Sequence, residues 1–406
     1  MLNTTLGGLI AQQIAESSQQ KISFAEFMDL ALYHPHHGYY SAGQAKIGAQ
    51  GDFFTAPHLG SEFGALLAEQ FTQMWQVMQR PDPFTLVEMG AGQGLLAADI
   101  LHHLQTHQPA CYGALHYIMI ERAAALIAEQ KRQLSPFLQA GLPLVWQTWE
   151  QVSSNSIVGC CFSNELVDAL PVHRVATAAG KLQEIYVTAQ PQPDGSIAWR
   201  EVCDRPSTPR LAHYFERVGI DLTAPAYADH YRTEVNLAAL DWLETVADRL
   251  HRGYLLTIDY GYPADRYYHP NRRDGTLQCY YRHAHHDDPY FAIGQQDITA
   301  HVDFTALQRH GEHCGLKPVG FTKQGLFLMA LGLGDHIAAL SQFTTTQPQT
   351  VLALLQRRDA LQQLIDPMGL GGFGVLIQSK GVNTAKTLRG LQGEVELYRN
   401  SGCSKV

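Results

Sequence analysis

The sequence lacks basic runs. Its 406 residues include 29 Lys and Arg against 38 Asp and Glu, and no basic cluster exceeds a pair. A net charge of −9 offers no positive field to a nucleic acid, so we expect no nucleic-acid partner. No stretch approaches 18 consecutive apolar residues, which argues against membrane insertion. The first 20 residues resemble neither a signal peptide nor an Arg-rich transit peptide, so we expect a cytoplasmic protein.

Cysteines with the spacing of a metal or redox motif are also missing. There are seven cysteines, an odd number, and no C-x-x-C occurs. Cys160 and Cys161 lie within an apolar run, so we expect reduced and mostly buried thiols. Two histidine clusters stand out, His34-Pro-His-His37 and His283-Ala-His-His286, but neither has a spacing that places two ligands on one helical face. We interpret both clusters as solvated loops and expect no metal.

Motifs of two rival α/β enzyme classes are absent as well. A Ser-His-Asp hydrolase of this class needs a G-x-S-x-G turn at its nucleophile, and the chain has none. The phosphate-binding motif G-x-x-x-x-G-K-[ST] is missing too, which excludes a P-loop enzyme. A glycine-rich turn in this chain therefore has to serve another ligand.

Such a turn follows an apolar strand at 85–89 and precedes a helix-forming run at 95–106. Three glycines occupy alternate positions in it: Gly90, Gly92 and Gly94. The order of strand, glycine-rich turn and helix brings the backbone close to a nucleotide-like ligand. The alternative is an ordinary tight turn that contacts no ligand. A dinucleotide fingerprint would need glycine where Leu95 stands. S-adenosyl-L-methionine (SAM) fits better because it has no pyrophosphate, and Glu88 before the turn suits its ammonium and sulfonium charges.

Strands and helices alternate along much of the chain, a rhythm typical of a mostly parallel sheet. We predict strands at 85–89, 116–121, 142–147, 156–163, 254–259, 316–322 and 373–380. We predict helices at 59–79, 95–106, 123–135, 166–170, 235–251, 303–314, 324–341 and 349–365, and an earlier one that starts with a capping box of Ser23 and Glu26. Two or three alternating strands at 173–203 break the rhythm, so we interpret 173–232 as an insertion. Residues 260–302 show little periodicity and are predicted to form a functional loop.

Two further residues are candidates for contact with such a cofactor. Glu121 ends the strand at 116–121, where a carboxylate can accept hydrogen bonds from both ribose hydroxyls. Its alternative role is to cap the following helix. Thr55 and Asp52 lie in a loop bounded by glycine and proline, which could close over the cofactor.

Acidic residues gather where the fourth and fifth strands end, at the edge where open α/β folds bind ligands. Asn164, Glu165 and Asp168 follow the strand at 156–163. A helical turn with i,i+3 spacing would put the two carboxylates on one face, where they could clamp a cation such as guanidinium or hold a base. Helix capping is the alternative. Asp259 ends the strand at 254–259 and could face a substrate or belong only to a turn.

Together these segments resemble one family, the MidA-like SAM-dependent methyltransferases, which include a mitochondrial complex I assembly factor that is a protein arginine methyltransferase. The resemblance covers residues 6 to 382. It rests on six motifs: Tyr33-His-Pro-x-x-Gly-Tyr-Tyr40, Gly51-Asp-Phe-x-Thr55, Glu88-x-Gly-x-Gly-x-Gly94, Asn164-Glu-x-x-Asp-Ala-Leu-Pro171, Asp259-Tyr-Gly261 and Gly294-x-Gln-Asp-Ile-Thr-Ala-His-Val302. In combination these motifs are highly specific.

The resemblance implies an α/β fold, namely a seven-strand class I SAM-dependent methyltransferase (Rossmann-like) sheet with an N-terminal helical extension and a strand-rich insertion. The expected parts are an N-terminal helical and cofactor-covering segment at 1–84, a methyltransferase core at 85–172 and 233–382, an inserted substrate-side subdomain at 173–232 and a mobile tail at 383–406.

The resemblance also implies symmetric dimethylation of an arginine on a subunit of a respiratory NADH-dehydrogenase-like complex, in support of complex assembly. The cofactor is then SAM, held by Thr55, Glu88, Gly90, Gly92, Gly94 and Glu121. The expected catalytic residues are Asn164, Glu165, Asp168 and Asp259, with Glu165 and Asp168 binding the guanidinium. A small-molecule methyltransferase and a non-catalytic SAM-binding assembly chaperone are the alternatives, and a homodimer is left open.

Overall fold

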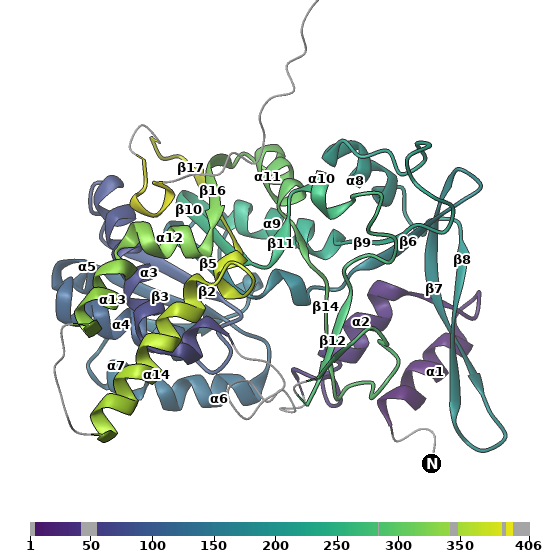
Figure 1. Ribbon diagram of the computed structural model, residues 1–406, viewed down its shortest axis with the longest axis horizontal. Helices are drawn as coiled ribbons and strands as arrows, with labels where there is room; N and C mark the ends of the chain where they lie inside the picture. The colour runs from purple at the N-terminus through teal and green to yellow at the C-terminus, as the bar shows by residue number, and fades with distance from the viewer. Residues whose placement is uncertain (1–4, 42–54, 283, 342–347, 384–386, 393–406) are drawn as a thin grey trace, which may run out of the picture.

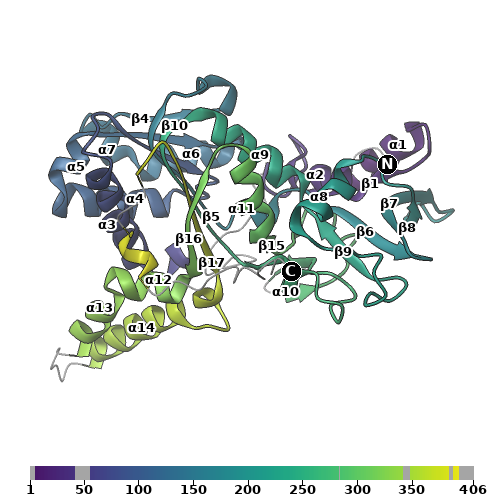
Figure 2. The ribbon, with the colours of Figure 1, turned by 90° about the horizontal axis from the view of Figure 1, so that it is seen from above.

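The computed structural model of the chain describes residues 5–41, 55–282, 284–341, 348–383 and 387–392. Two lobes lie side by side, one built on a seven-stranded sheet and the other on a smaller antiparallel sheet (Figure 1). The view from above shows the same division, with the N-terminal helices in the second lobe (Figure 2). Residues 51–54, which carry most of the Gly51-Asp-Phe-x-Thr55 motif, lie outside the described residues.

The larger sheet reverses its strand order in the middle. Its strands run in the order β16 (Lys317–Lys323), β17 (Gly374–Lys380), β10 (Leu250–Asp259), β5 (Ile157–Asn164), β2 (Phe84–Met89), β3 (Leu115–Ile120) and β4 (Leu144–Gln147). β17 is antiparallel to both neighbours, and the pairs from β10 to β4 are parallel. β2 lies between β3, the next strand in the sequence, and β5. The strand order therefore reverses at β2, and the carboxyl end of β2 lies where open α/β sheets bind ligands.

Helices cover both faces of this sheet, which explains why its strands are apolar on both sides. One face carries α3 (Glu62–Val77), α4 (Leu95–His107), α12 (Gln324–Leu331) and α14 (Pro348–Ile365), and the other carries α9 (Leu237–Arg249) and α11 (Phe304–His313). Cys160 packs with the first set and Cys161 with the second. The buried, unpaired thiols predicted there are confirmed. None of the helices in the described ranges is long and apolar enough to cross a bilayer.

The smaller sheet joins two segments that are far apart in the sequence. Its strands are β1 (Ile22–Ser23), β7 (Lys181–Pro191), β6 (His173–Ala178) and β9 (Arg232–Val235), in that order, with β8 (Ile197–Asp204) added to β7. α1 (Leu6–Glu16) and α2 (Phe24–Tyr33) pack against it. The capping box predicted at Ser23 and Glu26 begins α2 and is confirmed. The N-terminal helices thus belong with the insertion, while α3 belongs with the larger sheet.

Residues 260–302 are more regular than their weak periodicity predicted. They contain β11 (Gly261–Tyr262), α10 (Ala264–Tyr267), β12 (Gln278–Tyr281), β13 (Ala284–His286) and β14 (Asp297–Thr299). β12 pairs with β13 and β14, and β11 pairs with β15 (Val302–Asp303). Each of these strands has at most four residues, which is too short for a periodic signal.

Part of the predicted mobile tail is packed. The 3-10 turn η6 (Arg389–Leu391) contacts α12, and Leu388 and Leu391 are buried in the large core. The Gly390 N–H donates to the side chain of Gln70 at 2.9 Å. Residues 387–392 are therefore an element of the core rather than a tail.

The close approach of β5 to β2 generates a prediction. A Cβ on Gly159 would lie 1.9 Å from the Thr85 carbonyl oxygen. Gly159→Ala should therefore lower the free energy of unfolding by about 1–3 kcal/mol or more, the usual cost of overpacking. Chemical denaturation measures this loss. Gly113→Ala is the control, because a Cβ there has no neighbour within 4 Å; equal stability of the two variants would contradict the strand contact.

Candidate active site

Two cavities open at the carboxyl ends of the parallel strands. The first has a volume of about 770 Å³, within the usual range for small-ligand sites. Its walls come from the ends of β2, β3 and β5, from residues just after β4, and from the segments 33–41 and 55–58. Residues from the first four predicted motifs therefore meet around one space.

The glycine turn forms one wall of this first cavity. Gly90, Gly92 and Gly94 have φ of 70°, 52° and 81°, which are left-handed conformations that favour glycine. A Cβ on Gly90 would also come within 2.7 Å of Leu166. Gly90 and Gly92 line the cavity, whereas Gly94 lies at the start of α4 without lining it.

Glu88 lies buried beneath the turn and lines the same cavity. Its carboxylate accepts a hydrogen bond from the Tyr117 hydroxyl at 2.6 Å. Burial raises the pKa of Glu88 to about 7, against the opposing effect of that hydrogen bond. A cationic ligand group beside Glu88 would favour its ionised form.

Glu121 has one oxygen engaged and one mostly free. Its Oε1 accepts from the N–H groups of Arg122 (2.8 Å) and Ala123 (3.0 Å), which is the capping interaction considered as the alternative role. Within the described part of the chain, its Oε2 has only a long contact of 3.4 Å with Gln130. Glu121 lines the cavity, so ribose binding stays a prediction that this geometry permits.

Gln130 was not identified from the sequence, yet it connects the turn to Glu121. Its buried side chain donates to the Gly92 carbonyl oxygen at 2.8 Å and accepts from Trp146 at 2.8 Å. The three partners come from separate elements, so a single sequence carries no signal for this role.

The segment at 55–58 covers the turn. Thr55 Oγ1 lies 2.8 Å from Nδ1 of His58, whose Nε2 lies 3.2 Å from the Gln93 side chain inside the glycine turn. Thr55 lines the first cavity, where the sequence placed it. Asp52 lies outside the described residues.

Tyr33 and Tyr40 bring the N-terminal motif to the site. Their rings stack with centroids 5.5 Å apart. The Tyr33 hydroxyl donates to the Ala169 carbonyl oxygen at 2.9 Å, and the Tyr40 hydroxyl donates to Asp297 at 2.8 Å. The first bond attaches the N-terminal segment to the residues that follow β5, and the second attaches it to β14.

The second cavity, of about 1050 Å³, adjoins the first. Glu165 and Tyr40 line both cavities, so the two spaces meet at these side chains. Asp168 and Asp297 add carboxylates to the second cavity. Its aromatic wall is made by Tyr260, Tyr262, Tyr280, His301 and Phe373. Much of this wall comes from the segment predicted to be a functional loop.

The prediction that a helical face aligns Glu165 with Asp168 is wrong. Glu165 has φ of 52° and donates its N–H to the Ile258 carbonyl oxygen at 2.9 Å, which extends the pairing of β5 with β10. The helix predicted at 166–170 is a single 3-10 turn, η4 (Val167–Ala169). Glu165 lies outside η4 in a left-handed conformation, so the two carboxylates are brought together by a bend instead.

Burial raises the pKa values of Glu165 and Asp168 above those of exposed carboxylic acids. Burial and then the nearby Asp168 raise the pKa of Glu165 to about 8, although the Asn164 amide donates to Glu165 at 3.0 Å and acts in the opposite direction. Burial raises the pKa of Asp168 to about 6. Both groups would therefore gain from an adjacent cation.

Asp259 positions the bend rather than lining a cavity. It is fully buried, and its carboxylate accepts from the N–H groups of Val167 (2.9 Å), Asp168 (3.3 Å) and Tyr260 (2.9 Å). Burial, followed by Asp168 and Glu165, raises its pKa. This geometry favours the turn role over the substrate-facing role that the sequence also allowed.

Several buried polar atoms around the second cavity lack a hydrogen-bond partner within the described part of the chain. They are Asp168 Oδ1, the Tyr260 and Thr299 hydroxyls and His301 Nδ1. The Tyr260 hydroxyl lies near enough to Asp168 to lower its pKa, but no hydrogen bond of ordinary geometry joins them. Because buried polar groups are nearly always paired, such a set indicates a site for a polar ligand.

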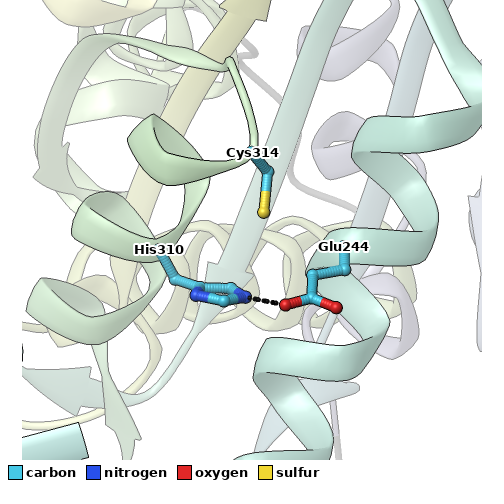
Figure 3. A group of neighbouring side chains, drawn as sticks. All are labelled: Glu244, His310 and Cys314. Carbon is cyan, nitrogen blue, oxygen red and sulfur yellow. Dashed lines mark ion pairs between the residues drawn. The ribbon is translucent and has the colours of Figure 1, made fainter. Parts of the chain in front are cut away.

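A further cluster lies between α9 and α11. The side chains of Glu244, His310 and Cys314 point toward one another, with their donor atoms all within 4.8 Å (Figure 3). These residue types bind zinc, but His310 already contacts Glu244 at 2.9 Å and the cluster lines neither cavity. We interpret it as a contact between the two helices. His36 and His37 are exposed in a loop, as predicted. The prediction of a loop at the second histidine cluster is wrong, because Ala284–His286 forms β13, in which His285 is exposed; His283 lies outside the described residues.

Residues 66–322 match the sequence profile of a family of S-adenosyl-L-methionine-dependent methyltransferases, which is more than half of the chain. The chain belongs to this family. A crystal structure of a protein from Burkholderia thailandensis, bound to S-adenosyl-homocysteine, superposes with a TM-score of 0.82 at 31% identity and covers 96% of this chain and 95% of that one. The family resemblance, the class I fold and the SAM cofactor predicted from the sequence are confirmed.

Curated relatives are more distant. The mitochondrial protein arginine methyltransferase NDUFAF7 homolog of Drosophila melanogaster is 28% identical, over 93% of this chain and 86% of that protein. Human NDUFAF7, also named a mitochondrial protein arginine methyltransferase, is 27% identical over 86% of this chain and 78% of its own length. Methyl transfer from SAM is the activity that the family match carries over to this chain.

The two oxygens of Glu121 generate a prediction about the cofactor. Glu121→Ala should weaken SAM binding by roughly 1–3 kcal/mol, the loss expected for a charged hydrogen-bond partner. Glu121→Gln keeps an acceptor for the N–H groups of Arg122 and Ala123 but removes the charge, so it should fold normally and still bind SAM more weakly. Calorimetric titration measures both affinities. Wild-type affinity in Glu121→Gln would leave this side chain with only its capping role.

The raised pKa of Glu165 predicts a pH dependence of stability. Its ordinary value is 4.5 and its folded value about 8, so the folded protein keeps a proton that the unfolded chain releases in this window. The contribution of Glu165 to stability is therefore fully present below pH 4.5 and is lost as the pH rises through about 8.

Thermal denaturation of the cofactor-free protein at several pH values tests this. The melting temperature of wild type should fall more steeply with rising pH than that of Glu165→Gln, which cannot titrate. Glu312→Gln, an exposed change on α11, should keep the wild-type slope. Identical slopes for wild type and Glu165→Gln would show that burial does not perturb this carboxyl.

Proposed function

We propose that the protein transfers a methyl group from SAM to the guanidinium of an arginine residue in a protein substrate. The observation that carries the proposal is the meeting of the two cavities at Glu165 and Tyr40. A methyl donor in the first cavity can react there with a group that arrives from the second.

The first cavity suits SAM in size and in chemistry. The backbone at Gly90 and Gly92 leaves room for the methionine part, and Glu88 offers an acceptor to its ammonium group. Glu121 offers an acceptor to the ribose, and the Trp149 ring offers an apolar surface to the adenine. When bound, SAM supplies a methyl group activated by the positive charge on sulfur.

Glu165 and Asp168 are the groups that would hold the guanidinium. Glu165 lies at the junction, and Asp168 has a buried oxygen without a partner. A guanidinium carries five N–H donors in a fixed fork, which two carboxylates satisfy better than one. The bound cation would in turn lower both raised pKa values, so the pair is ionised when the substrate is in place.

Catalysis in this arrangement is mostly positioning. The two carboxylates orient one guanidinium nitrogen toward the junction, in line with the methyl group, which removes most of the entropic cost of the encounter. As that nitrogen takes the methyl group and the carbon–sulfur bond breaks, one N–H proton would pass to the ionised carboxylate of Glu165, so the guanidinium keeps a single positive charge and no stronger base is needed. The 55–58 segment contacts the glycine turn through His58 and Gln93 and lines the first cavity.

The relatives and the sequence motifs together support a more specific product and substrate protein. The names of the curated relatives support arginine as the target. The resemblance of the motifs to the MidA-like family supports symmetric dimethylation of a subunit of a respiratory NADH-dehydrogenase-like complex. Methylation would then promote assembly of that complex.

Glu165→Gln tests the proposal, because it keeps the shape of the side chain and removes its charge. It should leave the SAM affinity nearly unchanged and lower the rate of methyl transfer by at least about tenfold, which corresponds to roughly 1.4 kcal/mol of transition-state stabilisation. Mass spectrometry of the methylated arginine measures the rate, and calorimetry measures the affinity. Glu312→Gln serves as the control with the same loss of charge.

Complex assembly in cells should fail together with methylation. Normal assembly in cells whose Glu165→Gln protein leaves the arginine unmethylated would instead favour the non-catalytic chaperone. An unchanged rate in Glu165→Gln would remove this carboxylate from the mechanism.

A further inference from the structure

Two cations line the second cavity together with its carboxylates: Arg266 and Lys323. In the described ranges neither side chain forms an ion pair. Their contacts are with aromatic rings, because Arg266 lies over Tyr262 at 4.3 Å and Lys323 lies 5.7 Å from the Phe321 ring centroid. The cavity therefore contains charges of both signs, and its cations are not neutralised by the carboxylates that share it.

The register of the sheet separates Lys323 from the carboxylates. Asp259 at the end of β10 and Lys323 at the end of β16 both pair with Gly374 of β17. Two strand spacings, about 9.5 Å, therefore lie between their backbones. Glu165 follows β5, which is one strand further away. The distance from Glu165 to Lys323 along the sheet edge is thus on the order of 14 Å.

The environment of the cations favours an anion. Lys323 is half-buried, and burial followed by the charge of Arg266 lowers its pKa. Arg266 is exposed and lies at the same cavity. A partly desolvated ammonium beside a like charge gains most from a carboxylate that approaches both.

We propose that Arg266 and Lys323 bind an acidic side chain of the substrate protein, located within about four residues of the target arginine. The proposal rests on the proposed function, which places the guanidinium at Glu165. Each residue of an extended peptide spans about 3.3–3.6 Å, so a distance on the order of 14 Å corresponds to about four residues. The acidic end of the cavity then takes the arginine, and the cationic end takes the Asp or Glu.

The separation between the acidic end and the cationic end of the cavity distinguishes a peptide from a small substrate. Free arginine carries its α-carboxylate on Cα, only one side chain away from its guanidinium. It cannot reach both charged ends of the cavity at once, whereas a peptide segment can. The Arg266 and Lys323 site therefore selects proteins over free guanidino compounds.

The test uses peptides with one arginine and one glutamate, in which the glutamate occupies each of the four positions on either side of the arginine. Matched peptides carry glutamine instead. Binding is measured by fluorescence anisotropy in the presence of S-adenosyl-homocysteine, and methylation is measured separately by mass spectrometry. For at least one position, the glutamate peptide should bind about tenfold more tightly than its glutamine partner, as expected for a charge-assisted hydrogen bond.

The preference should depend on the two cations. The double variant Arg266→Met with Lys323→Met should bind both peptides equally, and Lys323→Arg should keep the preference. Exposed cations outside the cavity provide the matched control, Arg273→Met with Lys317→Met, which should behave as wild type. Equal binding of every peptide pair by the wild-type protein, or a preference that survives in the double variant, would overturn the inference. Preferential binding without methylation of any peptide would instead contradict the proposed function.

Discussion

The active site depends on one buried carboxylate, that of Asp259. By accepting three backbone N–H groups, it fixes the bend after β5, where Glu165 takes a left-handed conformation and Asp168 faces the second cavity. Two carboxylates with raised pKa values would otherwise move toward water and away from each other, because hydration and repulsion both favour separation. The bend keeps them together at the junction of the cavities, where a methyl donor and a methyl acceptor can meet.

The charges of the site explain why both ligands should be cationic. Glu88 lies under the glycine turn with a pKa of about 7, and Glu165 lies at the junction with a pKa of about 8. Each is kept from ionising by burial, and each becomes a favourable partner when a cation replaces the lost water. The ammonium and sulfonium of SAM offer such charge on one side, and a guanidinium offers it on the other. Proton release is therefore coupled to the binding of both ligands.

The parts of the site that local patterns encode were predicted correctly from the sequence. The glycine turn, the strand that carries Glu88 and the strand that ends at Asn164 are continuous segments whose residue order identifies them. The second cavity was not predicted, because much of its wall comes from the 260–302 segment, whose strands are too short to give a periodic signal. The contacts of Gln130 and the attachment of the N-terminal helices to the insertion also join distant segments. The prediction of a helix at 166–170 was wrong because the carboxylate of Asp259, about ninety residues further along the chain, fixes the bend.

If the two cavities form one site for a methyl donor and a guanidinium, a single molecule can fill both. A bisubstrate compound tests it most directly: an adenosine and methionine framework in which nitrogen replaces sulfur and carries a guanidinoalkyl arm. This compound should bind at least about 100-fold more tightly than the same framework with a methyl group in place of the arm, since joined ligands gain effective concentration. Calorimetric titration with the wild-type protein gives both affinities. Equal affinities would mean that no guanidinium site adjoins the cofactor, and this would contradict the account.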